Sequence, residues 1–302
     1  MSEAINWRAK WQHFRKRSWD EIRKSWLENI PAFPSRGAKP DPGLEKLPSL
    51  LALETTSIPT VFPDLEGLRP NALWEAVFLF QKCAYAHLAA QRIGQEGMHC
   101  WSLFNAYHSA YLGAKGMMTL LGAPCPNVAG TQLALDLFPE PATKKRGLST
   151  PYFSEFKAIR LPRLEQRNVW EGFQRLLNIS EAKCWNLPLR EELLNLSHDA
   201  ISPPRNHFLY KAAFWPIPDL IDDLLPADLT KLYEGELDPE EVGFLIRLSC
   251  SVYLLFEQLL SDLANDSEAI RYQMDGSRIL ANAGQPVLQD YASFVVQASG
   301  AV

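Results

Sequence analysis

The sequence of 302 residues has few cysteines, and none of them are paired at the spacing of a metal or redox motif. A zinc knuckle and a thioredoxin-like site both need a C-x-x-C pair, and no such pair occurs. Isolated cysteines within helical patterns are usually small core residues. The five cysteines are therefore predicted to be structural: Cys83, Cys100, Cys125, Cys184 and Cys250.

Long apolar runs are also missing. No run reaches the roughly 18 residues that a membrane-spanning helix needs. The N-terminal stretch MSEAINWRAKWQHFRKRSW carries basic residues with no apolar run behind them, unlike a secretory signal. With 47% hydrophobic and 22% charged residues, the composition is that of an ordinary globular protein. These absences predict a cytoplasmic protein without membrane contact.

The common catalytic and nucleotide-binding motifs are absent as well. The sequence contains no GxxxxGK[ST], no strand-led GxGxxG, no HExxH and no GxSxG. Its histidines show no metal-ligand spacing on one helix. We therefore expect neither a metal nor a cofactor. The six histidines are His13, His87, His99, His108, His198 and His207.

Positive charge is scarce and gathers near the N-terminus. The formal net charge is -5, but residues 1–30 carry seven basic and four acidic residues, which leaves -8 for the remainder. Phosphate binding requires a concentrated positive surface. A general nucleic-acid coat protein is therefore excluded, and only a local basic patch could contact a nucleic acid.

Three segments follow from the hydrophobic pattern. Residues 5–29 predict an amphipathic helix, which with the basic residues forms an N-terminal arm over 1–30. Eight prolines in 31–70 predict an extended connector, and 71–302 is predicted to form the main domain. The arm either packs on its own domain or binds a partner. Its stripe consists of Trp7, Trp11, Phe14, Ser18, Ile22 and Trp26.

The main domain is predicted to be helical. Residues 71–94 and 99–122 are two long apolar helices with a short link, which predicts an antiparallel hairpin. Small residues crowd the second helix around Gly113, so another helix is expected to cross close against it. Further helices are predicted at 161–179, 188–200, 204–215 and 239–266, with an apolar turn and a basic loop over 127–150. The tail, 270–302, holds one more helix or a small hairpin. The predicted fold class is all-α, a helical bundle.

Two stretches resemble the HEPN family. They are NAYHSAYLGAKGMMTLLG in the hairpin and the Arg-Asn pair at a helix start in SPPRNHFLYK, and the likeness covers about residues 71–263. HEPN proteins are helical bundles of prokaryotic defence, toxin–antitoxin and RNA-processing systems. Many are metal-independent ribonucleases, whose motif is an arginine, a polar residue and a histidine five to seven positions after the arginine.

The resemblance implies a site that departs from the family pattern. Arg205 matches the arginine and Asn206 the polar residue, but Tyr210 stands where the histidine is expected. His207 would point about 200° away from Arg205 on a regular helix. A tyrosine, with a pKa near 10, is a poor base at neutral pH but can donate a hydrogen bond. His108 on the hairpin helix is a weaker candidate for the same cleft.

Two functions are left open. One is a HEPN-like protein that contacts RNA or nucleotide, either as a ribonuclease or, as the missing histidine favours, in a degenerate form. Its four candidate residues would meet in a cleft or at a homodimer interface. The other is a non-catalytic helical subunit that binds a protein partner through residues 1–30. In that case Arg205 would be a structural residue paired with an acid such as Asp199, Asp219 or Asp222.

Overall fold

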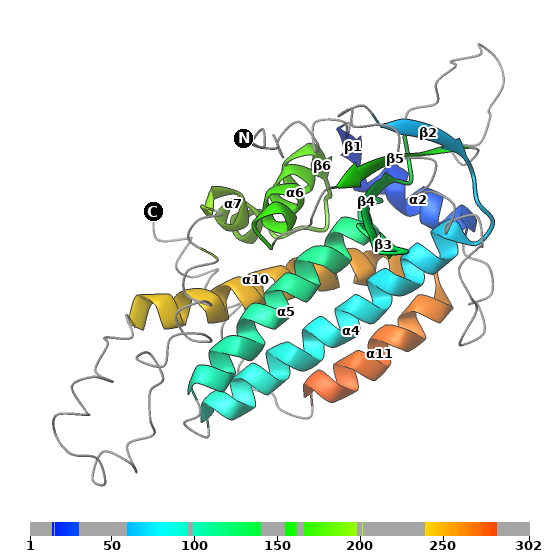
Figure 1. Cartoon of the computed structure of the whole chain (residues 1–302). Helices are drawn as coiled ribbons and strands as arrows, with labels where there is room; N and C mark the ends of the chain where they lie inside the picture. The colour runs from blue at the N-terminus through cyan, green and yellow to red at the C-terminus, as the bar shows by residue number, and fades with distance from the viewer. Residues whose placement is uncertain are drawn as a thin grey trace, which may run out of the picture. The chain divides into compact units, whose positions relative to one another are not determined.

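The computed structural model describes residues 14, 16–29, 59–95, 99–139, 155–161, 166–197, 201 and 239–282 (Figure 1). These residues are mostly helical, as predicted. The helices are α2 (Trp19–Asn29), α4 (Leu68–Gln95), α5 (His99–Leu120), α6 (Gln166–Ile179), α7 (Leu187–Asn195), α10 (Pro239–Ala264) and α11 (Glu268–Asn282).

The chain divides into two compact units. The first, called the sheet unit below, consists of Met1–Phe78, Ala114–Cys184 and Leu259–Arg271. The second, called the helical unit, consists of Leu79–Gly113, Trp185–Gln258 and Tyr272–Val302. Because α4, α5, α10 and α11 each contribute residues to both units, the long helices belong to neither unit alone.

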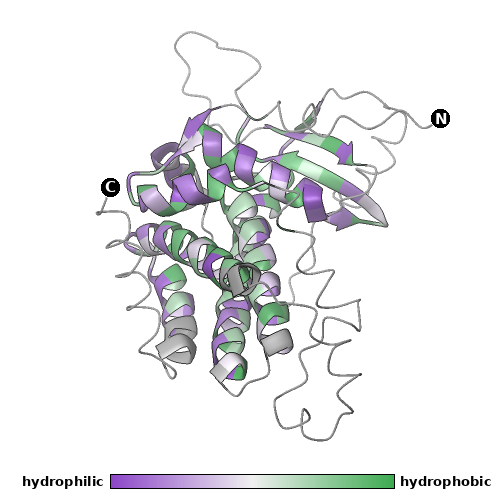
Figure 2. Ribbon diagram, turned by 90° about the vertical axis from the view of Figure 1, so that its left-hand side faces the viewer, coloured by the Kyte–Doolittle hydropathy of each residue, from purple (hydrophilic) through white to green (hydrophobic). Residues whose placement is uncertain are grey.

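The sheet unit contains a four-stranded antiparallel sheet in the order β2-β5-β4-β3. Its strands are β2 (Thr60–Pro63), β5 (Glu155–Leu161), β4 (Thr131–Asp136) and β3 (Asn127–Val128). In the central pair, Leu135 lies opposite Ala158. Along β5, polar and apolar residues alternate from Glu155 to Ala158, and Ile159 is buried directly after Ala158. The strands of the sheet carry both hydrophilic and hydrophobic residues (Figure 2).

A second, very short sheet joins the N-terminal segment to the end of α6. Its strands are β1 (Arg17–Ser18) and β6 (Ser180–Glu181), which pair in parallel. The two sheets correct the prediction of an all-α protein. The helix predicted for 161–179 begins only at Gln166, after β5, and the apolar turn predicted after residue 127 is the β3–β4 hairpin. Residues 60–63, inside the predicted connector, form β2.

The N-terminal helix is shorter than predicted. It begins at Trp19 and not at residue 5, because Ser18 and Glu21 form a reciprocal cap. The Glu21 N–H donates to Ser18 Oγ over 3.2 Å, and the Ser18 N–H donates to Glu21 Oε2 over 3.4 Å. Residues 1–13, with Trp7 and Trp11, lie outside the described residues.

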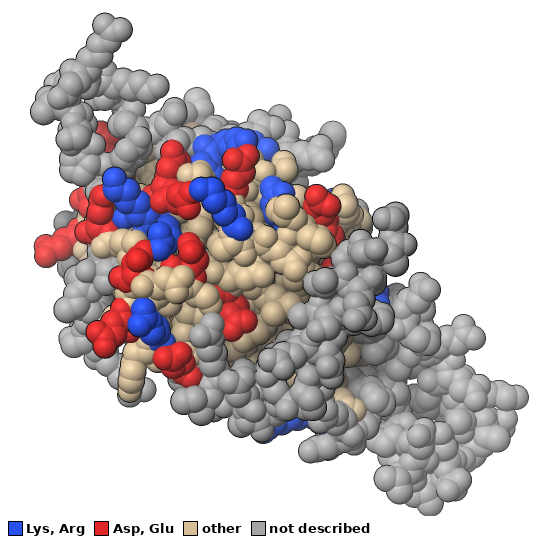
Figure 3. Space-filling view, turned by 180° about the vertical axis from the view of Figure 1, so that it is seen from behind, with Lys and Arg blue, Asp and Glu red and all other residues tan. Residues whose placement is uncertain are grey.

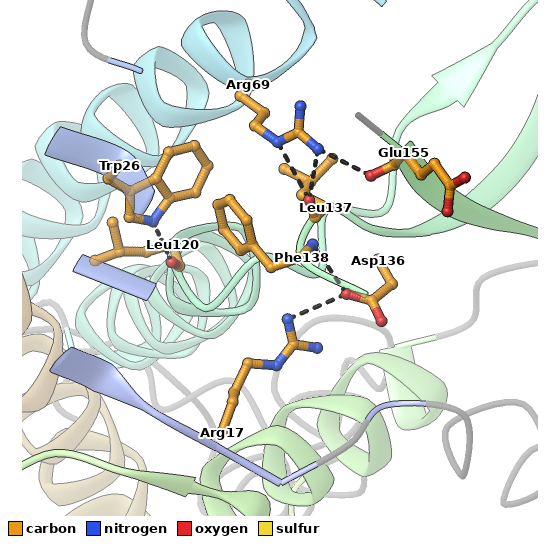
Figure 4. A network of polar contacts seen from close by, with 8 residues as sticks. All are labelled: Arg17, Trp26, Arg69, Leu120, Asp136, Leu137, Phe138 and Glu155. Carbon is orange, nitrogen blue, oxygen red and sulfur yellow. Dashed lines mark hydrogen bonds and ion pairs between the residues drawn. The ribbon is translucent and has the colours of Figure 1, made fainter. Parts of the chain in front are cut away.

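One face of α2 is buried within the sheet unit. Trp19, Ile22 and Trp26 are each at most 1% exposed. The indole Nε1 of Trp26 donates to the carbonyl oxygen of Leu120 over 2.8 Å, and its ring meets Phe138 edge-on at 4.9 Å (Figure 4). This part of the predicted arm therefore packs on its own chain.

Two buried arginines fix the end of β4. Arg69, on the first turn of α4, donates to the carbonyl oxygens of Leu137 and Glu155 over 3.0 Å each (Figure 4). It also pairs with Asp64. Arg17 donates to Asp136 Oδ1 over 3.1 Å. Such carbonyl groups need partners because an unpaired buried polar group is costly. The arginines thus join β1 and α4 to the sheet.

In the helical unit, α4 and α5 form the predicted antiparallel hairpin. Ser109 Oγ donates to the carbonyl oxygen of Cys83 over 2.9 Å, and Ser102 Oγ donates to that of Ala90 over 2.6 Å. The partner on α4 has a higher residue number where the partner on α5 has a lower one, so the two helices run antiparallel. The expected close crossing is also confirmed, because a Cβ on Gly113 would lie 2.6 Å from Val252 Cγ1 of α10.

Two other predicted helices have different limits. The helix predicted for 188–200 is α7, which ends at Asn195 and begins where Asn186 Oδ1 accepts from the Leu189 N–H over 3.2 Å. The tail contains α11, while residues 283–302 lie outside the described residues. The predicted helix 204–215 also lies outside them.

The most apolar helix passes a simple test for a membrane span. Phe244–Ala264 in α10 is long and apolar enough to cross a bilayer by length and composition. However, 61% of its apolar window is buried inside the protein, and core helices pass the same test. One such helix is weak evidence for a membrane protein.

The β3–β4 turn holds a strained alanine. Ala129 has φ 47° and Gly130 has φ 79°, which matches the type I′ turn of a two-residue hairpin. The left-handed region costs an L-residue about 1–2 kcal/mol, and glycine avoids that cost. Ala129→Gly is therefore expected to raise the free energy of unfolding by about 1 kcal/mol. Urea unfolding would measure it, and Ala89→Gly within α4 should show the opposite sign.

Candidate functional site

The predicted site falls only partly within the described residues. Arg205, Asn206 and Tyr210 lie outside them, so their positions relative to α5 remain predictions. His108 is described and lies in the middle of α5, where it is partly buried.

His108 belongs to a row of rings on one face of α5. Trp101, Phe104 and His108 are spaced i, i+3 and i+7, so their side chains follow one another along the helix. The Trp101 and Phe104 ring centroids are 5.9 Å apart and meet edge-on. The Phe104 and His108 rings are 4.5 Å apart and tilted by 46°. We call these three residues the α5 ring row.

Trp101 of the ring row is exposed and Phe104 and His108 are partly buried, while the opposite face of α5 is fully buried. Trp101 is 48% exposed, whereas Leu103, Ala106, Tyr107 and Ala110 are at most 1% exposed. The packing of α5 against α4 and α10 explains the difference, since only one face of the helix meets those neighbours. Aromatic rings at a surface can stack on nucleobases of any sequence.

The ring row lacks a cation of its own. Apart from its histidines, α5 has a single charged side chain, Lys115, which lies two turns beyond His108 and in the sheet unit. Metal-independent cleavage of RNA needs a base for the 2′-hydroxyl and a cation for the charge of the phosphorane. The ring row could supply stacking and an imidazole, and the cation would have to come from another segment.

The basic N-terminal residues that the structure describes are already paired with acids. Lys16 pairs with Glu181, Arg17 with Asp136, and Lys24 with Glu28. Arg23 pairs with Asp262 and Asp266. On the face drawn in Figure 3, blue and red side chains are interspersed. These four residues do not form the local basic patch that phosphate binding would require.

The four cysteines whose thiols are described are unsuited to nucleophilic chemistry. Burial raises the pKa of Cys83, Cys125 and Cys250 to about 12, and that of Cys184 to about 11. The reactive form of cysteine is the thiolate, which is scarce at neutral pH when the pKa is this high. Among the described residues, no group of three or more His, Cys, Asp or Glu could hold a metal ion.

The sheet unit contains a pocket of about 300 Å³. On one side it is lined by the first turns of α4, including Asn71 and Glu75, and on the other by the chain from Pro124 into the β3–β4 hairpin. The Glu75 side chain is exposed at the pocket. Protein atoms packed around its carboxyl group reduce its contact with water and raise its pKa, and the charge of Lys115 lowers the pKa by less. Sequence reasoning did not identify this pocket.

Comparison with known proteins does not assign the chain to a family. No family model matches it, and neither a curated protein nor a solved structure does.

Proposed function

We propose that the chain is a HEPN-like helical-bundle protein that contacts RNA or nucleotide, in a prokaryotic defence or toxin–antitoxin type of system. The observation that carries the proposal is the ring row of Trp101, Phe104 and His108 on α5, of which Trp101 is exposed and the other two are partly buried. His108 lies within NAYHSAYLGAKGMMTLLG, the stretch that resembles the family, and Trp101 and Phe104 precede it in the same helix.

In this proposal the rings bind bases and Arg205 binds phosphate. A guanidinium recognises a phosphate through two parallel N–H donors, which a lysine does not reproduce. Asn206 and Tyr210 supply hydrogen bonds, and His108 lines the same cleft within one chain or across a homodimer. Because Tyr210 replaces the expected base, the site is a degenerate, non-catalytic one that binds without cleaving.

Replacing Trp101 with alanine is expected to weaken RNA binding 5- to 150-fold, because stacking on one base contributes about 1–3 kcal/mol. Fluorescence anisotropy with a labelled single-stranded RNA would measure the dissociation constant. The control is Tyr272→Ala on α11, which removes an aromatic ring that is 76% exposed outside the ring row. Equal affinities for the two variants would contradict a role of the ring row.

The arginine is tested in the same assay. Arg205→Ala should abolish the contact with RNA or nucleotide, and Arg205→Lys should restore it only in part because lysine lacks the planar fork. Incubation with total RNA separates binding from cleavage. If the wild type cleaves RNA and Arg205→Ala does not, the chain is an active ribonuclease that uses Arg205. If Arg205→Ala cleaves RNA as the wild type does, Arg205 is not part of the cleavage site.

The alternative is a helical subunit that binds a protein through residues 1–30. The burial of Trp19, Ile22 and Trp26 within the sheet unit narrows this alternative, because these side chains are not available to a partner. Of the predicted aromatic stripe, Trp7 and Trp11 are then the candidates for docking. Wild-type protein that folds normally and binds no RNA or nucleotide would favour this alternative.

A further inference from the structure

The pocket of the sheet unit has an apolar floor and a polar rim. Leu68, Ala72 and Leu135 line it and are at most 6% exposed. Asn71 and Glu75 stand on the same face of α4, one turn apart, and Asn127 of β3 stands across from them. A volume of about 300 Å³ is at the lower end of the range for small-molecule sites.

We infer that this pocket binds a small organic cation, with an amine or amidinium head at Glu75 and a compact apolar body on the floor. Among the described lining residues, Glu75 is the only ionisable one, so the lining itself carries one carboxylate and no cationic side chain. The carboxamide oxygens of Asn71 and Asn127 can accept further N–H groups of the head. The inference shares no residue with the α5 ring row and does not rest on the proposed function.

The electrostatics of Glu75 support a cation over an anion. Burial disfavours the charged carboxylate, and the nearby Lys115 compensates only in part, so the pKa of Glu75 is raised. A cationic ligand would stabilise the carboxylate by direct pairing, and an amidinium can form two parallel N–H···O bonds with it. An anionic ligand of the same size would meet the Glu75 carboxylate in the lining, whereas Lys115 is not among the lining residues.

Benzamidine is a suitable probe because it joins an amidinium to a single ring. Calorimetric titration of the full-length protein should show benzamidine binding, with Glu75→Gln weakening it at least tenfold. Glu66→Gln changes an exposed glutamate in the turn before α4, which does not line the pocket, and should leave the affinity unchanged. Benzoate, an anion with the same ring, should not bind.

Charge reversal provides the second measurement. Glu75→Lys should lose benzamidine binding and gain benzoate binding, since the apolar floor is kept and only the sign of the rim changes. The inference is overturned if wild type does not bind benzamidine, if Glu75→Gln binds it as well as wild type does, or if benzoate binds wild type equally. Circular dichroism of each variant would show that the altered side chain has not unfolded the protein.

Discussion

Replacing Trp26 with alanine is expected to lower the free energy of unfolding by about 3–5 kcal/mol. The indole is fully buried, it packs edge-on against Phe138, and its Nε1 donates to the carbonyl oxygen of Leu120. Alanine would leave a cavity that the surrounding sheet and helices fill only in part, and it would leave that carbonyl without the indole donor. Urea unfolding followed by circular dichroism would measure the change.

Two further variants of α2 separate the effect of losing the Trp26 hydrogen bond from that of losing the whole ring, and from that of an exposed substitution. Lys24→Ala changes an exposed side chain on the same helix and should alter stability by less than about 0.5 kcal/mol. Trp26→Phe keeps an aromatic ring but loses the hydrogen bond, so it should fall between the other two. If Trp26→Ala unfolds at the same urea concentration as Lys24→Ala, then α2 does not pack on the sheet unit as described.

Truncation extends this test to the whole arm. Deleting residues 1–30 removes Trp19, Ile22 and Trp26 together and should lower the melting temperature markedly. Deleting only 1–13 leaves these residues and the cap of α2 in place. If the shorter deletion keeps the melting temperature and loses association with another protein, residues 1–13 serve a partner.

The long helices could be predicted because their signal is local. The apolar pattern of 71–93, 99–121 and 239–263 continues over six or more turns, and the corresponding helices are α4, α5 and α10. The small residues around Gly113 also indicated the close crossing that is found with Val252. The start of α2 had a local signal too, since Ser18 and Glu21 have the spacing of a capping box.

The sheet was missed because its pairing is not local. β2 pairs with β5, and Thr60 lies opposite Ala158, so no short window of sequence contains both strands. β5 alternates between polar and apolar residues without a break only from Glu155 to Ala158, which is a weaker signal than the long helical patterns. β3 has only two residues and carries no detectable pattern.

The buried ion pairs could not be predicted from the sequence because their partners, too, lie far apart along the chain. Arginine and aspartate are normally exposed, so Arg17, Arg69 and Asp136 would be assigned to the surface from sequence. Arg17 is one of the seven basic residues of 1–30, but its partner Asp136 is 119 positions away. The pocket at Glu75 could not be predicted from the sequence either. Its residues on α4 have a helical spacing, but its other wall is the β3–β4 hairpin, which lies far from α4 in the sequence.

Lowering the pH from 7 to 4 is expected to destabilise the protein through His87. The ring is buried between α4 and α10, stacked on Tyr253 at 5.6 Å. The Gln91 amide nitrogen donates to His87 Nε2 over 3.1 Å, so the proton of the neutral ring is on Nδ1 and is donated to Ser249 Oγ over 2.7 Å. A proton added to Nε2 would point at the N–H group of the Gln91 amide. The positive charge of the imidazolium would also be buried, with no acidic side chain among Gln91, Ser249 and Tyr253.

The sign and size of this pH effect on stability follow from the difference between the pKa of His87 in the folded and unfolded states. Burial lowers the pKa of His87 from 6.5 to about 4 in the folded protein. Above pH 6.5 both states are neutral and the full stability is present. Between pH 6.5 and 4 the unfolded chain takes up a proton and the folded protein does not, so stability falls by roughly 3 kcal/mol.

Comparison of wild type with His87→Gln isolates this contribution, because other groups titrate equally in both proteins. The variant should be less stable at pH 7, where the native contacts of the imidazole are lost, and its stability should fall less between pH 6.5 and 4. Nuclear magnetic resonance of the imidazole protons provides a direct check. A folded-state midpoint near 6.5 would show that His87 is not buried as described, whereas a midpoint near 4 would identify it as a group that makes the helical unit sensitive to acid.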